Sequence, residues 1–264
     1  MIKLISLDLD GTALNPKGRL SPGVKAAITK ARAAGLRVVI NTGRDCHEAA
    51  WFAQEAGCDT LNASTGGALV SDGGQILSRW DVPELAAHRA LETALSWNGV
   101  DLMIFAGNQT LVNSVYKRFL EKYYPFPAFH QDVIVTDSPM AYMVEHGLPL
   151  TKIHGELDPS CYPIEELAAI EGVSLTTSST HDFELVATGV DKGRALSLIA
   201  ATYAIPLDQC AAVGDSENDL GALRVVGMPI AMGNAPQHVK DTAIRIAPSN
   251  SEDGAAWAIL SCLE

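Results

Sequence analysis

Short apolar runs alternate with stretches of helical periodicity along the first part of the chain. The segment 3–10 is apolar at most positions, as in a buried parallel strand, and the segment 36–40 repeats this pattern. Between them, Ser21-Pro22 predicts the start of a helix that ends at Gly35, because serine caps helices and proline suits their first turn. A second helix is predicted over 47–55. Strands and helices that alternate with short connections indicate a doubly wound parallel sheet.

The last third of the chain repeats this pattern, whereas the middle differs. In the last third we expect three helices and three strands, namely helices 192–203, 218–224 and 236–243 and strands 211–213, 229–232 and 245–247. In the middle, helical and alternating patterns are mixed, with helices over 84–97, 115–124 and 162–170 and sheet over 101–113, 152–157 and 173–176. This mixture is typical of an α+β domain.

The domain organisation follows from this difference. We expect an α/β core with a Rossmann-like doubly wound parallel sheet, formed by 1–81 and 184–264, and an inserted α+β cap domain at 82–183. Asp72-Gly73-Gly74 predicts the tip of a hairpin.

Composition narrows the classes of partner. The 264 residues carry 19 Lys+Arg against 31 Asp+Glu, a net charge of −12, with no basic run. Nucleic acids and anionic membrane surfaces would be repelled, so neither is expected as a partner. No run reaches the ~18 apolar residues of a membrane span, and the charged residues Lys3 and Asp8 are not typical of a signal peptide. The five widely spaced cysteines form no C-x-x-C pair, so we expect a reducing, cytoplasmic location.

Polar residues follow several of the predicted strands, at the sheet edge where α/β proteins bind ligands. Asp8 and Asp10 are two residues apart, so in a strand they would lie on one face. Two neighbouring carboxylates repel each other, and a divalent cation relieves the repulsion. Asp215, after another strand, would complete an oxygen site suited to Mg²⁺. A lysine such as Lys192 and a hydroxyl such as that of Thr42 suit phosphoryl oxygens.

Together these segments resemble the motifs of the haloacid dehalogenase (HAD) superfamily, and within it those of the Cof-type phosphatases. The resemblance covers essentially the whole chain. It rests on the D-x-D-G-T, T-G-R, lysine and G-D-x-x-N-D motifs and on two tail signatures, which stand here at 8–12, 42–44, 189–193, 214–219, 231–235 and 249–254.

The resemblance implies a Mg²⁺-dependent phosphatase that hydrolyses small phosphomonoesters, such as sugar phosphates, through an aspartyl-phosphate. By analogy, Asp8 is the nucleophile and Asp10 is the general acid and then the base. Thr42 donates to a phosphoryl oxygen, and Lys192 offsets negative charge. The implied ligands of Mg²⁺ are the Asp8 carboxylate, the Asp10 backbone carbonyl and Asp215.

Further residues have supporting roles in this interpretation. Gly43, Arg44 and Asn218 would help to bind the phosphate, and Arg44 could instead pair with a carboxylate. Asn218 and Asp219 would orient Lys192 and the water molecules on the metal, although Asp219 could also be a helix cap.

Two positions depart from the family pattern. Gly66-Gly67-Ala68 stands where Asn-Gly-Ala is common, and Ala13 replaces the usual leucine.

Two other functions stay open. A phosphomutase would return the phosphoryl group to the sugar, and a non-hydrolytic protein on the same scaffold would bind a phosphometabolite. The presence of Asp8, Asp10, Lys192 and Asp215 together favours an enzyme, because a binding protein has no use for both a nucleophile and an acid/base. Cap segments 105–109, 116–118 and 151–154 are expected to contact the leaving group, while the sequence predicts no oligomeric state.

Overall fold

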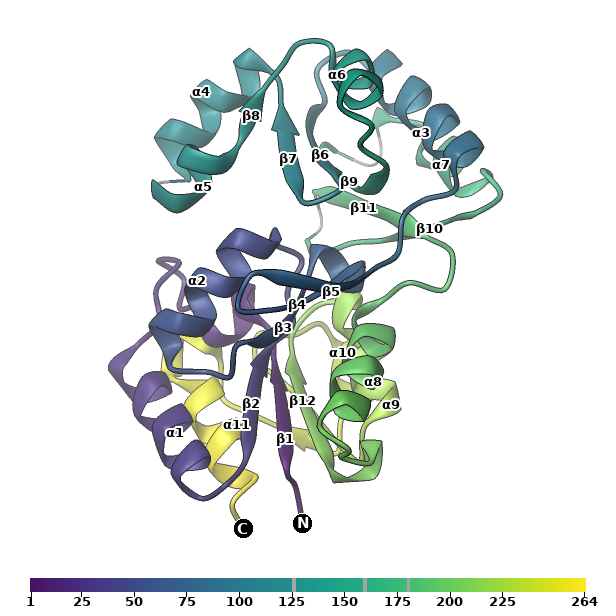
Figure 1. Ribbon diagram of the computed structural model, residues 1–264. Coiled ribbons are helices and arrows are strands. Elements are labelled where there is room, and N and C mark those ends of the chain that lie inside the picture. The colour runs from purple at the N-terminus through teal and green to yellow at the C-terminus, as the bar shows by residue number, and fades with distance from the viewer. Residues whose placement is uncertain (125–126, 159–160, 180) are drawn as a thin grey trace. The chain divides into compact units, whose positions relative to one another are not determined.

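The computed structural model describes residues 1–124, 127–158, 161–179 and 181–264, which form two compact units. The core unit comprises Met1–Ser78 and Asp191–Glu264, and the inserted unit comprises Arg79–Val190 (Figure 1). The core unit is thus built from two separate stretches of the chain.

The second domain boundary differs from the one expected at 183/184. That position falls inside strand β11 (Asp182–Ala187). Residues of β11 pair antiparallel with β9 (Leu150–Glu156), from Asp182 opposite Glu156 to Leu185 opposite Ile153. Because a strand shares its hydrogen bonds with its own sheet, the whole of β11 belongs to the inserted unit.

The core sheet has five parallel strands in the order β14-β13-β12-β1-β2. Their bounds are β1 Leu4–Leu7, β2 Arg37–Ile40, β12 Cys210–Gly214, β13 Met228–Ala231 and β14 Arg245–Ile246. All residues of β1 and β12 are buried, which explains why apolar residues fill most of their positions. The expected fold class, an α/β protein with a parallel sheet, is confirmed.

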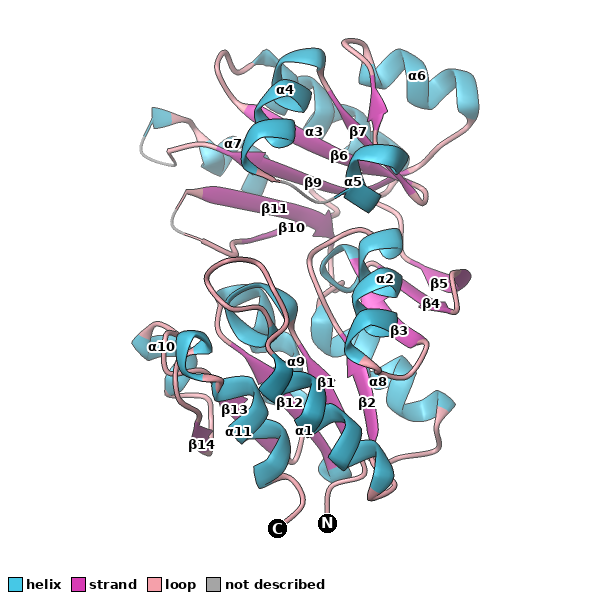
Figure 2. Ribbon diagram, turned by 90° about the vertical axis from the view of Figure 1, so that its left-hand side faces the viewer, coloured by secondary structure: helices cyan, strands magenta, loops and turns pink. Residues whose placement is uncertain are grey.

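Helices cover both faces of this sheet. Their bounds are α1 Pro22–Ala33, α2 Cys46–Ala56, α8 Lys192–Thr202, α9 Leu220–Val225, α10 Gln237–Lys240 and α11 Gly254–Ser261. Helices α1 and α11 pack together on one face, and α8 and α9 pack together on the other (Figures 1 and 2). The predicted start of α1 is confirmed, since the Ser21 hydroxyl accepts from the Val24 N–H at 3.0 Å.

A small second sheet extends the core unit beyond β2. It contains β3 (Leu61–Ser64), β4 (Leu69–Asp72) and β5 (Gln75–Arg79), in that order. The predicted hairpin tip joins β4 to β5, and both of its glycines have positive φ. A single parallel bridge between Asn41 and Ala63 links this sheet to the end of β2.

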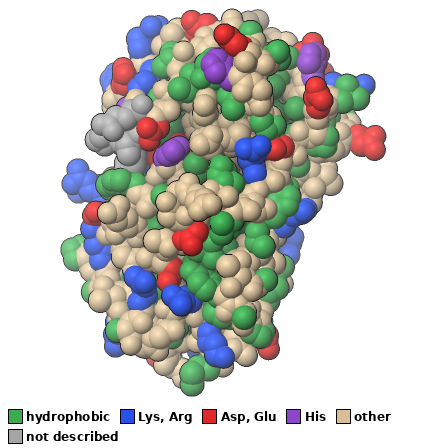
Figure 3. All heavy atoms as spheres, in the orientation of Figure 1, with side chains coloured by type: hydrophobic (Ala, Val, Ile, Leu, Met, Phe, Trp, Pro, Cys, Tyr) green, Lys and Arg blue, Asp and Glu red, His purple; other side chains and the backbone are tan. Residues whose placement is uncertain are grey.

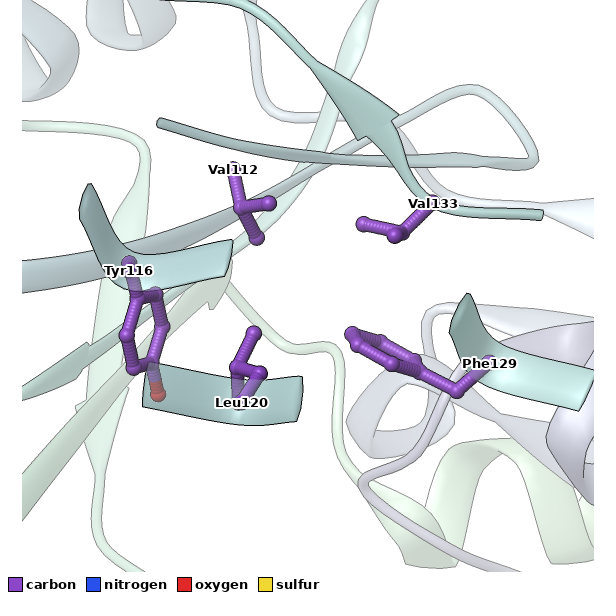
Figure 4. Close-up of a cluster of buried hydrophobic side chains, with 5 residues drawn as sticks. All are labelled: Val112, Tyr116, Leu120, Phe129 and Val133. Carbon is purple, nitrogen blue, oxygen red and sulfur yellow. The ribbon is translucent and has the colours of Figure 1, made fainter. Parts of the chain in front are cut away.

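The inserted unit has its own six-stranded sheet, in the order β10-β11-β9-β6-β7-β8, with the mixed composition expected of an α+β domain. The remaining strands are β6 Asp101–Ala106, β7 Gln109–Val112, β8 Ile134–Val135 and β10 Val173–Thr176. The helices are α3 Glu84–Ser96, α4 Ser114–Tyr123, α5 Pro127–Asp132, α6 Pro139–His146 and α7 Ile164–Ala168. Figure 4 shows part of its core, in which side chains from β7, α4 and α5 meet.

Two further observations concern the outside of the molecule. On the face drawn in Figure 3, Lys and Arg side chains are interspersed with Asp and Glu and do not gather into a basic patch. In the part of the chain that the structure describes, no helix is both long enough and apolar enough to cross a membrane.

Candidate active site

The predicted site residues of the core unit gather at the carboxyl ends of its parallel strands. Asp8 directly follows β1, Asp215 directly follows β12, and Thr42 lies two residues beyond β2. Lys192 begins α8, and its carbonyl accepts a hydrogen bond from the Asn41 side chain at 3.0 Å. Parallel strands end at one edge of a sheet, so residues distant in sequence are brought together there.

Lys192 is the centre of the site. Its Nζ donates to Asp8 Oδ1 at 2.7 Å and to Asp219 Oδ1 at 2.6 Å. All three side chains are buried. Asp219 Oδ2 in turn accepts from the backbone N–H groups of Asp215 and Ser216, at 2.9 and 3.1 Å. The interpretation of Asp219 as a residue that orients Lys192 and the interpretation as a cap are therefore both compatible with this geometry.

Two glycines make room for this arrangement. A Cβ on Gly11 would lie 2.2 Å from Asp215 Oδ2, and one on Gly214 would lie 2.3 Å from Asp219 Cγ. Gly11 also has φ +76°, a conformation that favours glycine. The glycines of the D-x-D-G-T and G-D segments thus allow the backbone to approach the carboxylates closely.

Burial governs the charge of these groups. Burial raises the pKa of Asp8 well above its ordinary value, and Lys192 opposes this shift. Burial lowers the pKa of Lys192, but the attraction of Asp219 and Asp8 outweighs it and the net shift is upward. Burial and repulsion by Asp219 raise the pKa of Asp215 to about 7. The site therefore has an excess of negative charge that a cation would relieve.

The donor set fits a hard divalent cation. Carboxylate oxygens of Asp8, Asp215 and Asp219 all lie within 4.8 Å of one another, and such oxygen ligands are typical of Mg²⁺ sites. This cluster differs from the expected ligand set in containing Asp219, whose carboxylate already accepts from Lys192. The Asp10 side chain is not part of the cluster.

Asp10 is held by Arg44 instead. Arg44 donates to both oxygens of Asp10, from Nε to Oδ2 and from an Nη to Oδ1, each at 2.7 Å. Its other Nη donates to the buried carboxylate of Glu48 at 2.8 Å, and its guanidinium lies 4.9 Å from the centre of the Phe52 ring. This pairing with carboxylates is one of the two predicted roles of Arg44, and its role in phosphate binding stays a prediction. Asp8 and Asp10 do not share a strand face, because β1 ends at Leu7.

Comparisons with known proteins identify the family of the chain. The family model of haloacid dehalogenase-like hydrolases matches residues 5–259. The chain belongs to this family. The match confirms the resemblance drawn from the motifs and the expected enzyme class, a HAD-type phosphatase.

Relatives match most of the length of this HAD hydrolase. Phosphatase YwpJ of Bacillus subtilis (strain 168) is 29% identical to this chain over an alignment 287 residues long. The alignment covers 97% of this chain and 98% of that protein. The HMP-PP phosphatase of Citrobacter koseri is 27% identical over 249 residues, with 91% and 88% covered. A solved haloacid dehalogenase-like hydrolase from B. subtilis superposes with a TM-score of 0.85 at 26% identity, covering 98% of this chain and 99% of that chain.

The remaining predicted residues of the HAD motifs lie around the carboxylates. Thr42 is fully buried, and its hydroxyl accepts from the Arg44 N–H at 3.2 Å. Gly43 lies between these two residues. The Asn218 side chain accepts from the Ser216 hydroxyl at 2.9 Å, so it supports the turn that precedes α9. The role of Asn218 in orienting Lys192 stays a prediction.

The departure at Gly66 has a structural explanation. Gly66 has φ +67° and ψ +23°, in the left-handed region. Glycine and asparagine are the two residues that adopt this region most readily. The backbone turn is therefore compatible with either residue, and only the amide side chain is lost.

Sequence reasoning missed three residues that contact the site. Thr12 and Asn234 donate to the Asp215 carboxylate, at 2.9 and 3.2 Å. Glu48 binds Arg44. The sequence carries a weak signal for Glu48. It follows Arg44 by four residues at the start of a helix, a spacing that places the two side chains side by side.

Proposed function

We propose that the chain is a Mg²⁺-dependent phosphatase of small phosphomonoesters that works through an aspartyl-phosphate on Asp8. The observation that carries this proposal is the buried contact of Lys192 with Asp8 and Asp219 beside the Asp215 carboxylate. Covalent catalysis requires the anionic form of Asp8, and Lys192 favours that form against the effect of burial.

The reaction would run in two displacements. A carboxylate oxygen of Asp8 forms a bond to phosphorus while the bond from phosphorus to the leaving oxygen breaks. Asp10, released from Arg44 and protonated, gives that oxygen its proton. Water then attacks the phosphorus of the aspartyl-phosphate, and Asp10 takes up a proton from it. Inorganic phosphate leaves and Asp8 is restored.

Several residues would support these steps. Lys192 offsets negative charge on Asp8 and the phosphoryl group, and the Thr42 hydroxyl donates to a phosphoryl oxygen. In this structure, Arg44 binds both oxygens of Asp10. One Asp10 oxygen therefore has to turn away from Arg44 to reach the leaving group. A bound Mg²⁺, held by Asp8, Asp215 and the Asp10 carbonyl, would supply charge that lets an anionic monoester approach a carboxylate.

We infer that the substrate is a phosphorylated sugar, polyol or similar small metabolite. Three relatives at 25–28% identity are named 5-amino-6-(5-phospho-D-ribitylamino)uracil phosphatases, and HMP-PP phosphatase is another relative. The inserted unit offers polar residues among apolar ones in the segments expected to select the substrate. Lys152, in the last of these segments, is buried, donates to Glu184 at 2.5 Å and lies 5.2 Å from the Phe105 ring centre, so it does not itself face solvent. We also propose that the protein is cytoplasmic, as expected from its widely spaced cysteines.

Metal removal tests the proposed function. Treatment with EDTA should stop phosphate release from a panel of phosphometabolites, and Mg²⁺ should restore it, because the donors are oxygens. Restoration by Zn²⁺ but not by Mg²⁺ would contradict the site. Transfer of phosphate to another position of the same sugar, without release, would favour the phosphomutase. Tight binding without turnover would favour the binding protein.

A further inference from the structure

The tail signature around Asn234 reaches the carboxylate cluster. Asn234 lies in the loop after β13, and its Nδ2 donates to the Gly11 carbonyl at 2.9 Å and to Asp215 Oδ2 at 3.2 Å. Its Oδ1 accepts from the backbone N–H of Asn250 at 3.0 Å. We propose that Asn234 is a positioning residue that fixes the Asp215 carboxylate for a divalent cation, and that the Asn250 N–H sets the direction of the Asn234 amide.

The direction of the amide follows from its neighbours. A side-chain amide has one acceptor end and one donor end. The Asn250 N–H can only donate, so it requires the oxygen of Asn234. The Gly11 carbonyl can only accept, so it requires the nitrogen. Both contacts therefore demand the same orientation, which points an N–H at Asp215.

Asp215 is then held from two sides. Oδ1 accepts from the Thr12 hydroxyl at 2.9 Å, and Oδ2 accepts from Asn234. Each carboxylate oxygen thus has one donor, supplied by a different loop, and rotation about the Cβ–Cγ bond would break both hydrogen bonds. Each oxygen keeps lone-pair capacity for a cation. Partners of this kind orient metal ligands and tune their affinity.

The tail itself is anchored close to the site. The Gly233 N–H donates to the Pro248 carbonyl at 3.2 Å, and a Cβ on Gly233 would lie 2.8 Å from the Ser249 nitrogen. The Asn250 side chain donates to the Leu14 carbonyl at 2.9 Å. The two tail signatures thus contact each other and the turn after β1, which gives both of them a physical role.

This inference rests on the proposed function, because it assumes that Asp215 binds a cation. The test is the affinity of the full-length protein for Mg²⁺, measured by titration calorimetry without substrate. Asn234→Ala should weaken binding about 10–100-fold, the effect expected when a partner of a ligand is lost. Gln237→Ala is the control, since that amide donates to Asp241 instead.

A pair of variants at position 250 tests the orientation of the amide. Asn250→Pro removes the N–H, and proline is tolerated here because residue 250 is the first of a helical turn and follows an extended residue. Asn250→Ala keeps the N–H and removes only the side chain. The proline variant should bind Mg²⁺ several-fold more weakly than the alanine variant. Equal affinities would overturn the role given to the Asn250 N–H.

The outcomes separate this inference from the proposed function. If wild type binds Mg²⁺ and folded Asn234→Ala binds it within twofold, the positioning role is overturned and the phosphatase proposal stands. If wild type binds no divalent cation, the magnesium part of the proposed function fails and this inference fails with it. If Asn234→Ala does not fold, the comparison of the two variants at position 250 decides.

Discussion

At the scale of single residues, Asp8 faces opposing demands. It is buried, which favours its neutral form, yet a nucleophile has to be charged. Lys192 opposes the effect of burial by direct contact with Asp8, and Asp219 also accepts from this lysine. Removing one member of such a buried cluster leaves the others with unbalanced charge.

Asp8→Asn should abolish turnover while the fold is kept. The amide has the shape of the carboxylate but cannot attack phosphorus, and loss of a nucleophile costs several orders of magnitude in rate. Phosphate release and circular dichroism measure the two effects. Asp241→Asn, on the exposed end of α10, is the control and should keep wild-type activity. A rate above a few per cent of wild type in Asp8→Asn would exclude the covalent mechanism.

The thiol of Cys58 should resist alkylation in the native protein. Burial and the neighbouring Asp59 raise its pKa to about 12, so at pH 8 it stays protonated and unreactive. Exposed Cys161 should react with iodoacetamide first, as mass spectrometry of the digested protein would show.

The raised pKa of Cys58 also makes the stability of the folded protein depend on pH. Because the folded pKa of Cys58 lies above that of the unfolded chain, ~8.5, its contribution to stability is complete below that value and falls as the pH rises from there towards 12. Equal labelling of Cys58 and Cys161 in the folded protein would contradict both expectations.

At the scale of elements, close backbone contacts fix where α8 begins. Gly67, in the turn after β3, has φ +90°, and a Cβ there would lie 2.1 Å from the Asp191 carbonyl oxygen. Asp191 caps α8, whose first residue is Lys192. The turn therefore helps to position the lysine of the site.

Two glycine variants separate backbone strain from this contact. Gly73→Ala introduces only strain, since Gly73 has φ +55° and nothing lies within 4 Å of the new Cβ, and it should cost about 1–2 kcal/mol. Gly67→Ala adds a clash with backbone and should cost about 3–5 kcal/mol. Urea denaturation measures both losses. Similar losses in the two variants would mean that the Asp191 contact yields without cost.

Elements of the core unit were the most predictable from the sequence. Helix α1 has a serine cap and proline at its start, and β1 is apolar at every position except Ser6, so local signals and tertiary context agree there. In the inserted unit, β8 and α5 were not predicted, because they are short and have little periodicity. Strand β11 was missed because its alternating polar residues, Asp182 and Glu184, are buried by their partners in the fold.

The candidate site, like the fold, was predictable from the sequence only in part. Residues with motif spacing, such as Asp8, Lys192 and Asp215, could be picked out because several segments matched in order. The contacts within the site could not be predicted from the sequence. The bidentate pairing of Asp10 with Arg44, for example, depends on how the loop after β2 turns back. Asn234 was noted only as part of a signature, because its role depends on a contact with residue 250.

At the scale of the whole molecule, the two units differ in how the chain builds them. The inserted unit is one continuous stretch, Arg79–Val190, with its own sheet and buried clusters. The core unit needs both flanking stretches, because β1 lies between β2 and β12.

Expressed alone, residues 79–190 should fold and unfold cooperatively in urea, as expected for a sheet with its own core. Residues 1–78 alone should not, since β1 would lack β12 and expose an unpaired edge. Far-ultraviolet circular dichroism during denaturation distinguishes the two outcomes. A cooperative transition in 1–78, or none in 79–190, would contradict this division.

The distance in sequence between Asp8 and Lys192, 184 residues, has a consequence for the newborn chain. At ~5–20 residues per second, the lysine leaves the ribosome on the order of ten to forty seconds after its aspartate. During that interval β1 has no β12 beside it, and Asp8 has no lysine to hold its charge. The inserted unit can finish folding before residues 191–264 of the core unit have been synthesised. The proposed chemistry is therefore assembled last, and a chain interrupted during synthesis carries a nucleophile that cannot yet act.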